Sequence, residues 1–119
     1  MKKLSSIFLI FAYCFFASAE AASNKVSFGN ISELASGNLR IVFQLEQVAL
    51  INSYALDDPS RIVIDIKNTE LASAINASAF SPIKSIRASE VNETVRVVID
   101  LKGSVFWKKP WQVKHNDRV

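Results

Sequence analysis

Apolar and polar residues alternate along short segments from Leu39 to the end of the chain. An alternation with a period of two is typical of a β-strand with one buried face, and no segment keeps the spacing of an amphipathic helix. The clearest segments are 39–45, 61–67 and 95–102. Their inward face is predicted to hold Ile41, Phe43, Ile62, Ile64, Val97 and Ile99. The pattern predicts an all-β chain of antiparallel strands, each with a buried and a solvated face.

Weaker patterns predict strands at Val26–Phe28, Leu50–Leu56, Ile83–Ala88 and Val105–Trp107, the last continuing at 112–113. Asp57–Ser60 contains a proline preceded by aspartate, which suits a type I turn closing a hairpin. The stretch Leu71–Phe80 is rich in alanine and serine, and we expect a short helix or a crossover between two halves there.

A six-residue pattern recurs along the chain, and it reads R-[IV]-V-[FI]-[QD]-[LI]. Its copies begin at Arg40, Arg61 and Arg96, and the first two are 21 residues apart. Arg118 and Val119 match its first two positions 22 residues after Arg96. The spacing predicts an internal duplication, with the last strand truncated.

The first 21 residues have the three parts of a secretory signal peptide. Lys2 and Lys3 precede the apolar run Ile7–Ala17, and small residues then allow cleavage after Ala19 or Ala21. The run is shorter than the roughly 20 residues of a membrane-spanning helix, so we expect a cleaved leader and no membrane association afterwards.

Cleavage changes the charge of the chain. The 119 residues carry 14 basic and 11 acidic side chains, but loss of Lys2 and Lys3 leaves 12 basic against 11 acidic. This balance lacks the basic stripe that a nucleic-acid partner requires. Cys14, the only cysteine, also leaves with the leader, so the domain at 24–119 must rely on a hydrophobic core rather than on disulfides.

Four stretches of the sequence resemble the amidase N-terminal domain, or AMIN domain. They are Gly37–Phe43, Tyr54–Ile66, Ile83–Arg87 and Val95–Leu101. The resemblance extends from about Val26 to the end. It implies a small β-sandwich of two similar antiparallel sheets, exported to the periplasm by the general route.

The resemblance also implies a function. AMIN domains are peptidoglycan-binding modules that direct a partner domain, commonly a zinc N-acetylmuramoyl-L-alanine amidase, to the site of cell division. Related copies precede pilus secretins, so the alternative is an envelope-assembly module that binds protein partners.

No catalytic centre of its own is expected in this chain, and no metal or cofactor. A zinc hydrolase needs about three protein ligands, and the chain has one histidine, His115, which we expect in a loop. Asp65 and Asp100 could face each other as a glycosidase pair, but each lies beside an arginine. A neighbouring cation would lower both carboxyl pKa values and remove the general acid.

Two sets of residues are candidate ligand contacts. Arg40, Arg61 and Arg96 could take the carboxylates of peptidoglycan stem peptides, or they could form a cross-strand ion-pair ladder with the aspartates. Trp107 and Trp111 could stack on sugar rings, or one could close the core while the other is merely exposed.

Overall fold

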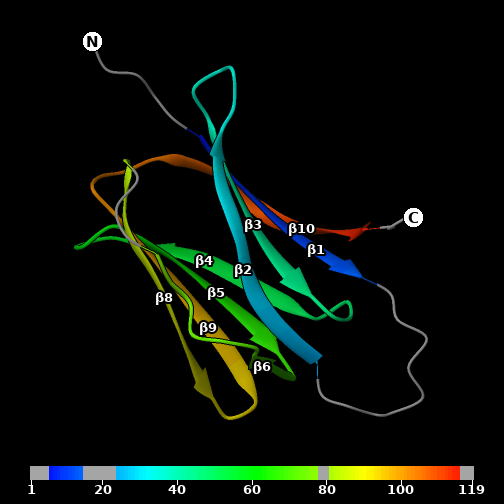
Figure 1. Ribbon diagram of the computed structural model, residues 1–119. Helices are drawn as coiled ribbons and strands as arrows, with labels where there is room; N and C mark the ends of the chain where they lie inside the picture. Colours follow the sequence, from blue (N-terminus) through cyan, green and yellow to red (C-terminus); the bar gives the residue numbers. More distant parts are fainter. Residues whose placement is uncertain (1–5, 15–23, 78–80, 116–119) are drawn as a thin grey trace.

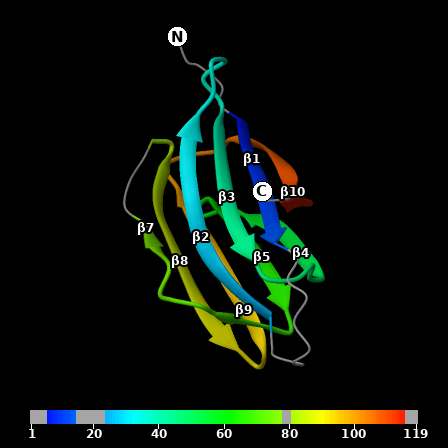
Figure 2. The same cartoon turned by 45° about the vertical axis from the view of Figure 1, so that its right-hand side comes forward.

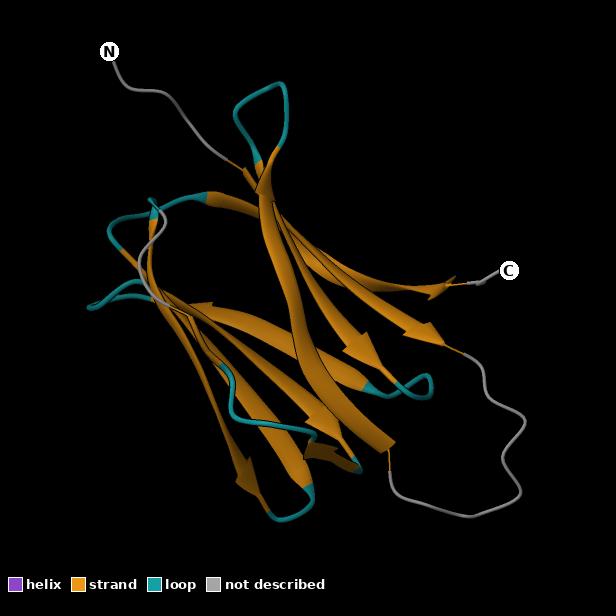
Figure 3. Ribbon diagram, in the orientation of Figure 1, coloured by secondary structure: helices purple, strands orange, loops and turns teal. Residues whose placement is uncertain are grey.

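The computed structural model describes residues 6–14, 24–77 and 81–115, which form two packed β-sheets (Figure 1). Sheet A contains, in spatial order, β10 (Phe106–His115), β1 (Ser6–Cys14), β3 (Leu39–Leu45), β2 (Asn24–Glu33) and β6 (Thr69–Leu71). Sheet B contains β4 (Ile51–Leu56), β5 (Arg61–Lys67), β9 (Thr94–Leu101), β8 (Ile83–Val91) and β7 (Asn76–Ala77). The described residues include no helix, which confirms the all-β sandwich (Figure 3).

The core lies between the two sheets and is aliphatic and aromatic. The six residues predicted to point inward, Ile41, Phe43, Ile62, Ile64, Val97 and Ile99, are all completely buried. Their outward neighbours are polar or partly exposed, apart from the buried Val63, because successive side chains of a strand point to opposite faces. The alternation in the sequence therefore marks the core correctly.

The expectation that both sheets are antiparallel is wrong for sheet A. Sheet B is antiparallel at every pairing. In sheet A, however, β1 runs parallel to both β3 and β10, and β2 runs parallel to β6. The parallel pairings involve strands that are joined by long connections, whereas the antiparallel pair β2–β3 is a hairpin.

The apolar run of the expected leader contains strand β1, which lies between β3 and β10 in sheet A (Figure 2). Its inward side chains Ile7, Leu9 and Phe11 are completely buried. The rings of Phe11 and Phe43 stack with centroids 5.0 Å apart and planes inclined by 15°. The uncleaved chain thus uses this segment as core, while the predicted cleavage sites at Ala19 and Ala21 lie outside the described residues.

Each half of the sequence contributes strands to both sheets. The chain passes from β3 in sheet A to β4 in sheet B, and likewise from β9 in sheet B to β10 in sheet A. Residues 71–77 lead from β6 in sheet A to β7 in sheet B, so this stretch is a crossover with two short strands rather than a helix. Arg118 and Val119 lie outside the described residues.

The predicted hairpin at Asp57–Ser60 is present, since β4 and β5 pair antiparallel around it. Asp58, which precedes the proline in this turn, has a φ of 53°, and the Asp58–Pro59 peptide bond is cis.

Candidate functional site

The outer face of sheet B carries a bidentate ion pair between neighbouring strands. Arg96 on β9 lies opposite Asp65 on β5 in register. Its Nε donates to Asp65 Oδ1 at 2.9 Å, and its Nη2 donates to Oδ2 at 3.1 Å. The Asp65 side chain is 11% exposed and that of Arg96 is 47% exposed. Arg96 is therefore paired within the sheet, as the ladder interpretation expects.

Asp100 is held in the same way, but by an arginine that the sequence did not indicate. Arg87 on β8 donates from Nε to Asp100 Oδ2 at 2.9 Å and from Nη2 to Oδ1 at 3.3 Å. The hydroxyl of Ser85 also donates to Oδ2 at 2.9 Å. Arg61, the register partner of Asp100, instead donates from Nη1 to the carbonyl oxygen of Pro59 at 2.6 Å.

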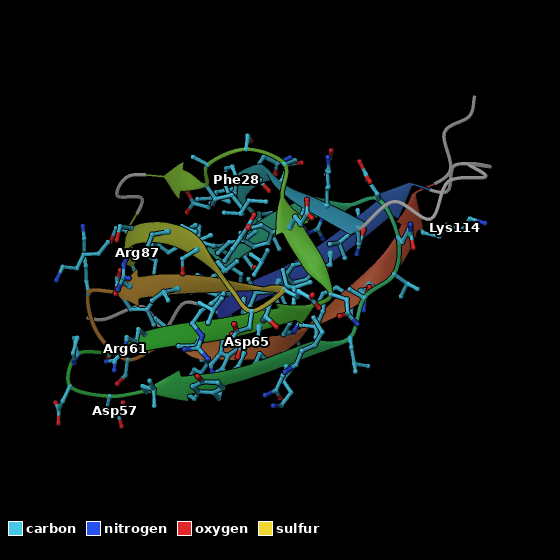
Figure 4. All side chains as sticks on the ribbon, turned by 90° about the horizontal axis from the view of Figure 1, so that it is seen from below. Phe28, Asp57, Arg61, Asp65, Arg87 and Lys114 are labelled. Carbon is cyan, nitrogen blue, oxygen red and sulfur yellow. The ribbon has the colours of Figure 1, made fainter. Side chains whose placement is uncertain are left out.

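These contacts keep both aspartates ionised. The hydrogen bonds from Arg96 lower the pKa of Asp65, against an opposing effect of burial. The hydrogen bonds from Arg87 lower the pKa of Asp100, again against burial. The predicted direction of both pKa shifts is confirmed. Neither carboxyl is suited to act as a general acid near neutral pH. Figure 4 shows Arg61 and Arg87 near the end of sheet B that carries Asp57, with Asp65 further along the sheet.

The outer face of sheet A has a different character, because it combines cations with apolar side chains. Arg40 on β3 is exposed between the buried residues Leu39 and Ile41. In register, Phe8 on β1 lies between Arg40 and Lys108. The Lys108 ammonium lies 5.6 Å from the centre of the Phe8 ring. Among the residues that the structure describes, no ion pair involves Arg40.

Trp111 lies on this same outer face, one row further along the strands. It is opposite Ile10, which is opposite Val42. Its ring meets Phe8 edge to face at 6.5 Å, and the residue is 42% exposed. Arg40 and Trp111 are thus separated by one intervening strand, or about 10 Å across the sheet.

Trp107 lies on the opposite face of β10 from Trp111. It is opposite Ile7 and packs against the core, where the Lys109 ammonium lies 5.9 Å from its ring. The register of β10 shifts between the partners of Phe8 and Ile10, so one extra residue separates Lys108 from Trp111. A bulge of this kind reverses the inward and outward alternation. Of the two tryptophans, only Trp111 is therefore available on the outer surface.

The AMIN domain family model matches residues 30–119. This chain belongs to the AMIN domain family. AMIN domains are peptidoglycan-binding and targeting modules of amidases and secretins. A comparison with curated proteins found no match. A comparison with solved structures found none either.

The candidate residues are divided between the two outer faces of this AMIN domain. Arg61 and Arg96 lie on sheet B, whereas Arg40 lies on sheet A, so the three arginines do not form one surface. Arg40 and Trp111 are brought together with Lys108 and with Phe8, and the sequence did not single out Phe8. The lysine follows Trp107 by one residue, but its outward position depends on the parallel pairing of β1 and β10.

The AMIN domain also has a pocket of about 500 Å³ at the end of the sandwich where β2 begins. Asn24 lines it, but its side chain is fully engaged. The amide Nδ2 donates to the Gln47 carbonyl at 3.0 Å and to Thr69 Oγ1 at 3.3 Å, and Oδ1 accepts from the Gln47 N–H at 2.8 Å. These bonds hold the 46–50 loop against sheet A. The polar groups of Asn24 in the pocket wall therefore have a structural role.

The described part of the AMIN domain contains no group of three or more His, Cys, Asp or Glu side chains that could hold a metal ion. His115, expected in a loop, is the last residue of β10. Within the described ranges there is also no helix long and apolar enough to cross a membrane.

Proposed function

We propose that this chain is a non-catalytic periplasmic module that binds peptidoglycan, as the septal-localisation domain of a cell-wall amidase does. The observation that carries the proposal is the outer face of sheet A in an AMIN domain, where Arg40, Lys108 and Trp111 lie in adjacent rows. Glycan rings stack on indole and phenyl faces, and stem-peptide carboxylates pair with guanidinium groups.

Sheet A is the better candidate because the arginines Arg61, Arg87 and Arg96 of sheet B are already engaged. Arg96 and Arg87 each donate two hydrogen bonds to an aspartate. Arg61 donates to the carbonyl oxygen of Pro59 in the adjacent turn. Binding an anionic ligand there would require those internal bonds to break. On sheet A, neither Arg40 nor Lys108 forms an ion pair with a carboxylate among the described residues, and Arg40, Lys108 and Trp111 all lie outside the expected leader.

Sedimentation with purified peptidoglycan sacculi tests the proposal. The wild-type protein should sediment with sacculi, and added salt should weaken the binding because exposed charges are screened. Arg40→Gln and Trp111→Ala should each reduce the bound fraction without lowering the melting temperature by more than a few degrees. Arg61→Gln is the matched control on sheet B and should bind like the wild type. Release of soluble muropeptides by the purified protein would contradict the non-catalytic assignment.

A second candidate function is an envelope-assembly module of a pilus or secretion secretin. It is favoured by the apolar residues exposed on edge strand β10, where Phe106 is 62% and Val113 is 44% exposed. Edge strands with apolar side chains are common protein-binding surfaces. Protease-treated sacculi separate the two functions. Binding that survives removal of wall-associated proteins supports the peptidoglycan module, and binding that disappears supports the assembly module.

A further inference from the structure

The position of β1 in sheet A corresponds to the position of β5 in sheet B. β5 lies between β4 and β9, and it pairs with the strand that carries the Arg96 copy of the repeat. β1 lies between β10 and β3, and it pairs with the strand that carries the Arg40 copy. The duplication therefore assigns this position in sheet A to a copy of the repeat, yet β1 does not match the repeat pattern.

The direction of β1 is also reversed relative to this expectation. β5 is antiparallel to both of its neighbours, whereas β1 is parallel to both of its own. The pairing with β10 includes a register shift between Phe8 and Ile10, while no shift interrupts the pairing of β5 with either neighbour. β1 thus supplies apolar side chains between β3 and β10, but it lacks the antiparallel pairing that the repeat strand β5 makes with both of its neighbours.

The charges on the outer face support the same reading. In sheet B, the first residue of one repeat copy lies opposite the fifth residue of the other, which places Arg96 opposite Asp65. Applied to β3, this register puts the fifth residue of an incoming repeat strand opposite Arg40, and its first residue opposite Gln44. β1 instead places Phe8 opposite Arg40. An aspartate at the fifth position would give Arg40 the bidentate partner that Arg96 has.

The inward positions coincide as well. β1 inserts Leu9 beside Ile41 and Phe11 beside Phe43, and all four side chains are completely buried. In the antiparallel register of sheet B, the fourth and second residues of a repeat strand would occupy those two levels. In the copy at Arg96 these residues are Ile99 and Val97, both completely buried. An incoming repeat strand can therefore replace the core side chains of β1 level by level.

We propose that the space between β3 and β10 is a strand-accepting groove, and that its preferred occupant is an antiparallel strand of the pattern R-[IV]-V-[FI]-D-[LI] with its aspartate opposite Arg40. β1 is an exchangeable occupant. Removal of the leader would empty the groove and open it to such a strand. A strand bound in this way would engage two of the five N–H donors of Arg40, as Asp65 engages two donors of Arg96.

The test compares the full chain with the same chain extended by Val-Ile-Asp-Leu after Val119, so that Arg118 and Val119 begin a complete repeat strand. Amide hydrogen exchange followed by mass spectrometry reports on β1 directly. In the extended chain, the amides of Ser6–Cys14 should exchange at least tenfold faster, because β1 is displaced, while β5 and β9 keep their protection. An extension of Val-Ile-Lys-Leu is the matched control and should displace β1 less, because its lysine faces Arg40.

Charge reversal completes the test. Arg40→Asp should reverse the preference, so that the lysine extension displaces β1 two- to fivefold more effectively than the aspartate extension. Unchanged protection of β1 in the chain with the aspartate extension would overturn the proposal, as would equal displacement by both extensions. If an extended chain does not fold, the wild-type chain is titrated with a labelled Arg-Val-Val-Ile-Asp-Leu peptide and its lysine counterpart. Tighter binding of the aspartate peptide then supports the groove, and absent or equal binding refutes it.

Discussion

Arg96 and Asp65 face each other across β9 and β5 and are joined by two parallel hydrogen bonds of 2.9 and 3.1 Å. The carboxylate is largely buried, while the guanidinium is about half exposed. Val63, which lies two residues before Asp65 on the same face of β5, is only 4% exposed. The pair therefore both links two central strands and helps to cover the outer surface of sheet B.

Asp65→Asn should lower the free energy of unfolding by about 1 kcal/mol, because the substitution removes the charge-assisted bonds from a partly exposed pair. A double-mutant cycle with Arg96→Gln, measured by chemical denaturation, isolates the pairwise contribution. Lys84, an exposed residue of β8, provides the control substitution Lys84→Gln. A coupling free energy of zero would show that the two side chains contribute independently.

The lowered pKa values of Asp65 and Asp100 predict a loss of stability in acid. In the folded protein these groups bind protons less readily than in the unfolded chain, where their ordinary pKa is 3.8. Their contribution is therefore complete well above pH 4 and is lost as the pH falls below it. Urea unfolding from pH 7 to pH 2 should show this decline. The Asp65→Asn, Asp100→Asn double variant should have a shallower slope below pH 4, and an unchanged slope would refute the assignment.

Gly29 lies at the bulge in β2 and cannot accept a side chain without movement of β3. A Cβ at this position would lie 2.7 Å from the backbone oxygen of Val42. We expect Gly29→Ala to destabilise the protein by about 1 to 3 kcal/mol, as overpacking does. Gly103→Ala is the matched control, since nothing lies within 4 Å of its Cβ position. Thermal melts of the two variants that coincide would contradict this prediction.

Phe11→Ala tests whether β1 is part of the core of the uncleaved chain. Its ring stacks on Phe43, and both residues are completely buried. Either Phe11→Ala or Phe43→Ala should cost about 3 to 5 kcal/mol in the full chain. Ile10→Ala, on the outer face of the same strand, should cost less. A Phe11→Ala chain as stable as the Ile10→Ala chain would show that β1 is not packed as described.

Export with cleavage remains a prediction of the tripartite start of the sequence. The periplasmic protein should begin at Glu20 or Ala22, as determined by intact-mass spectrometry. Replacing Ala17, Ala19 and Ala21 with bulky residues should block processing, with Ala12→Leu as the control outside the cleavage region. A periplasmic product that retains Met1 would contradict the prediction.

The alternation of residues predicted the core strands because the direction of a side chain in a strand is a local property. Register across strands is not local. The partner of Asp100 was missed because Arg87 reaches it diagonally from β8, beside a shift in the pairing of that strand. Trp111 could not be placed on the outer face of sheet A because a single extra residue in β10 decides its direction. We expected the leader to be cleaved, and its apolar run does not follow the repeat pattern. The pairing of β1 with β3 and β10 was therefore not predicted.

The pairing of β1 with β10 has a consequence for the order of events during synthesis. Ser6 pairs with Phe106, about 100 residues later in the chain. At 5 to 20 residues per second, a ribosome needs roughly 5 to 20 s to produce that partner. Until then one edge of β1 has no partner strand. If the leader directs export as we predict, translation therefore gives the export machinery time to bind it before β1 is paired on both sides.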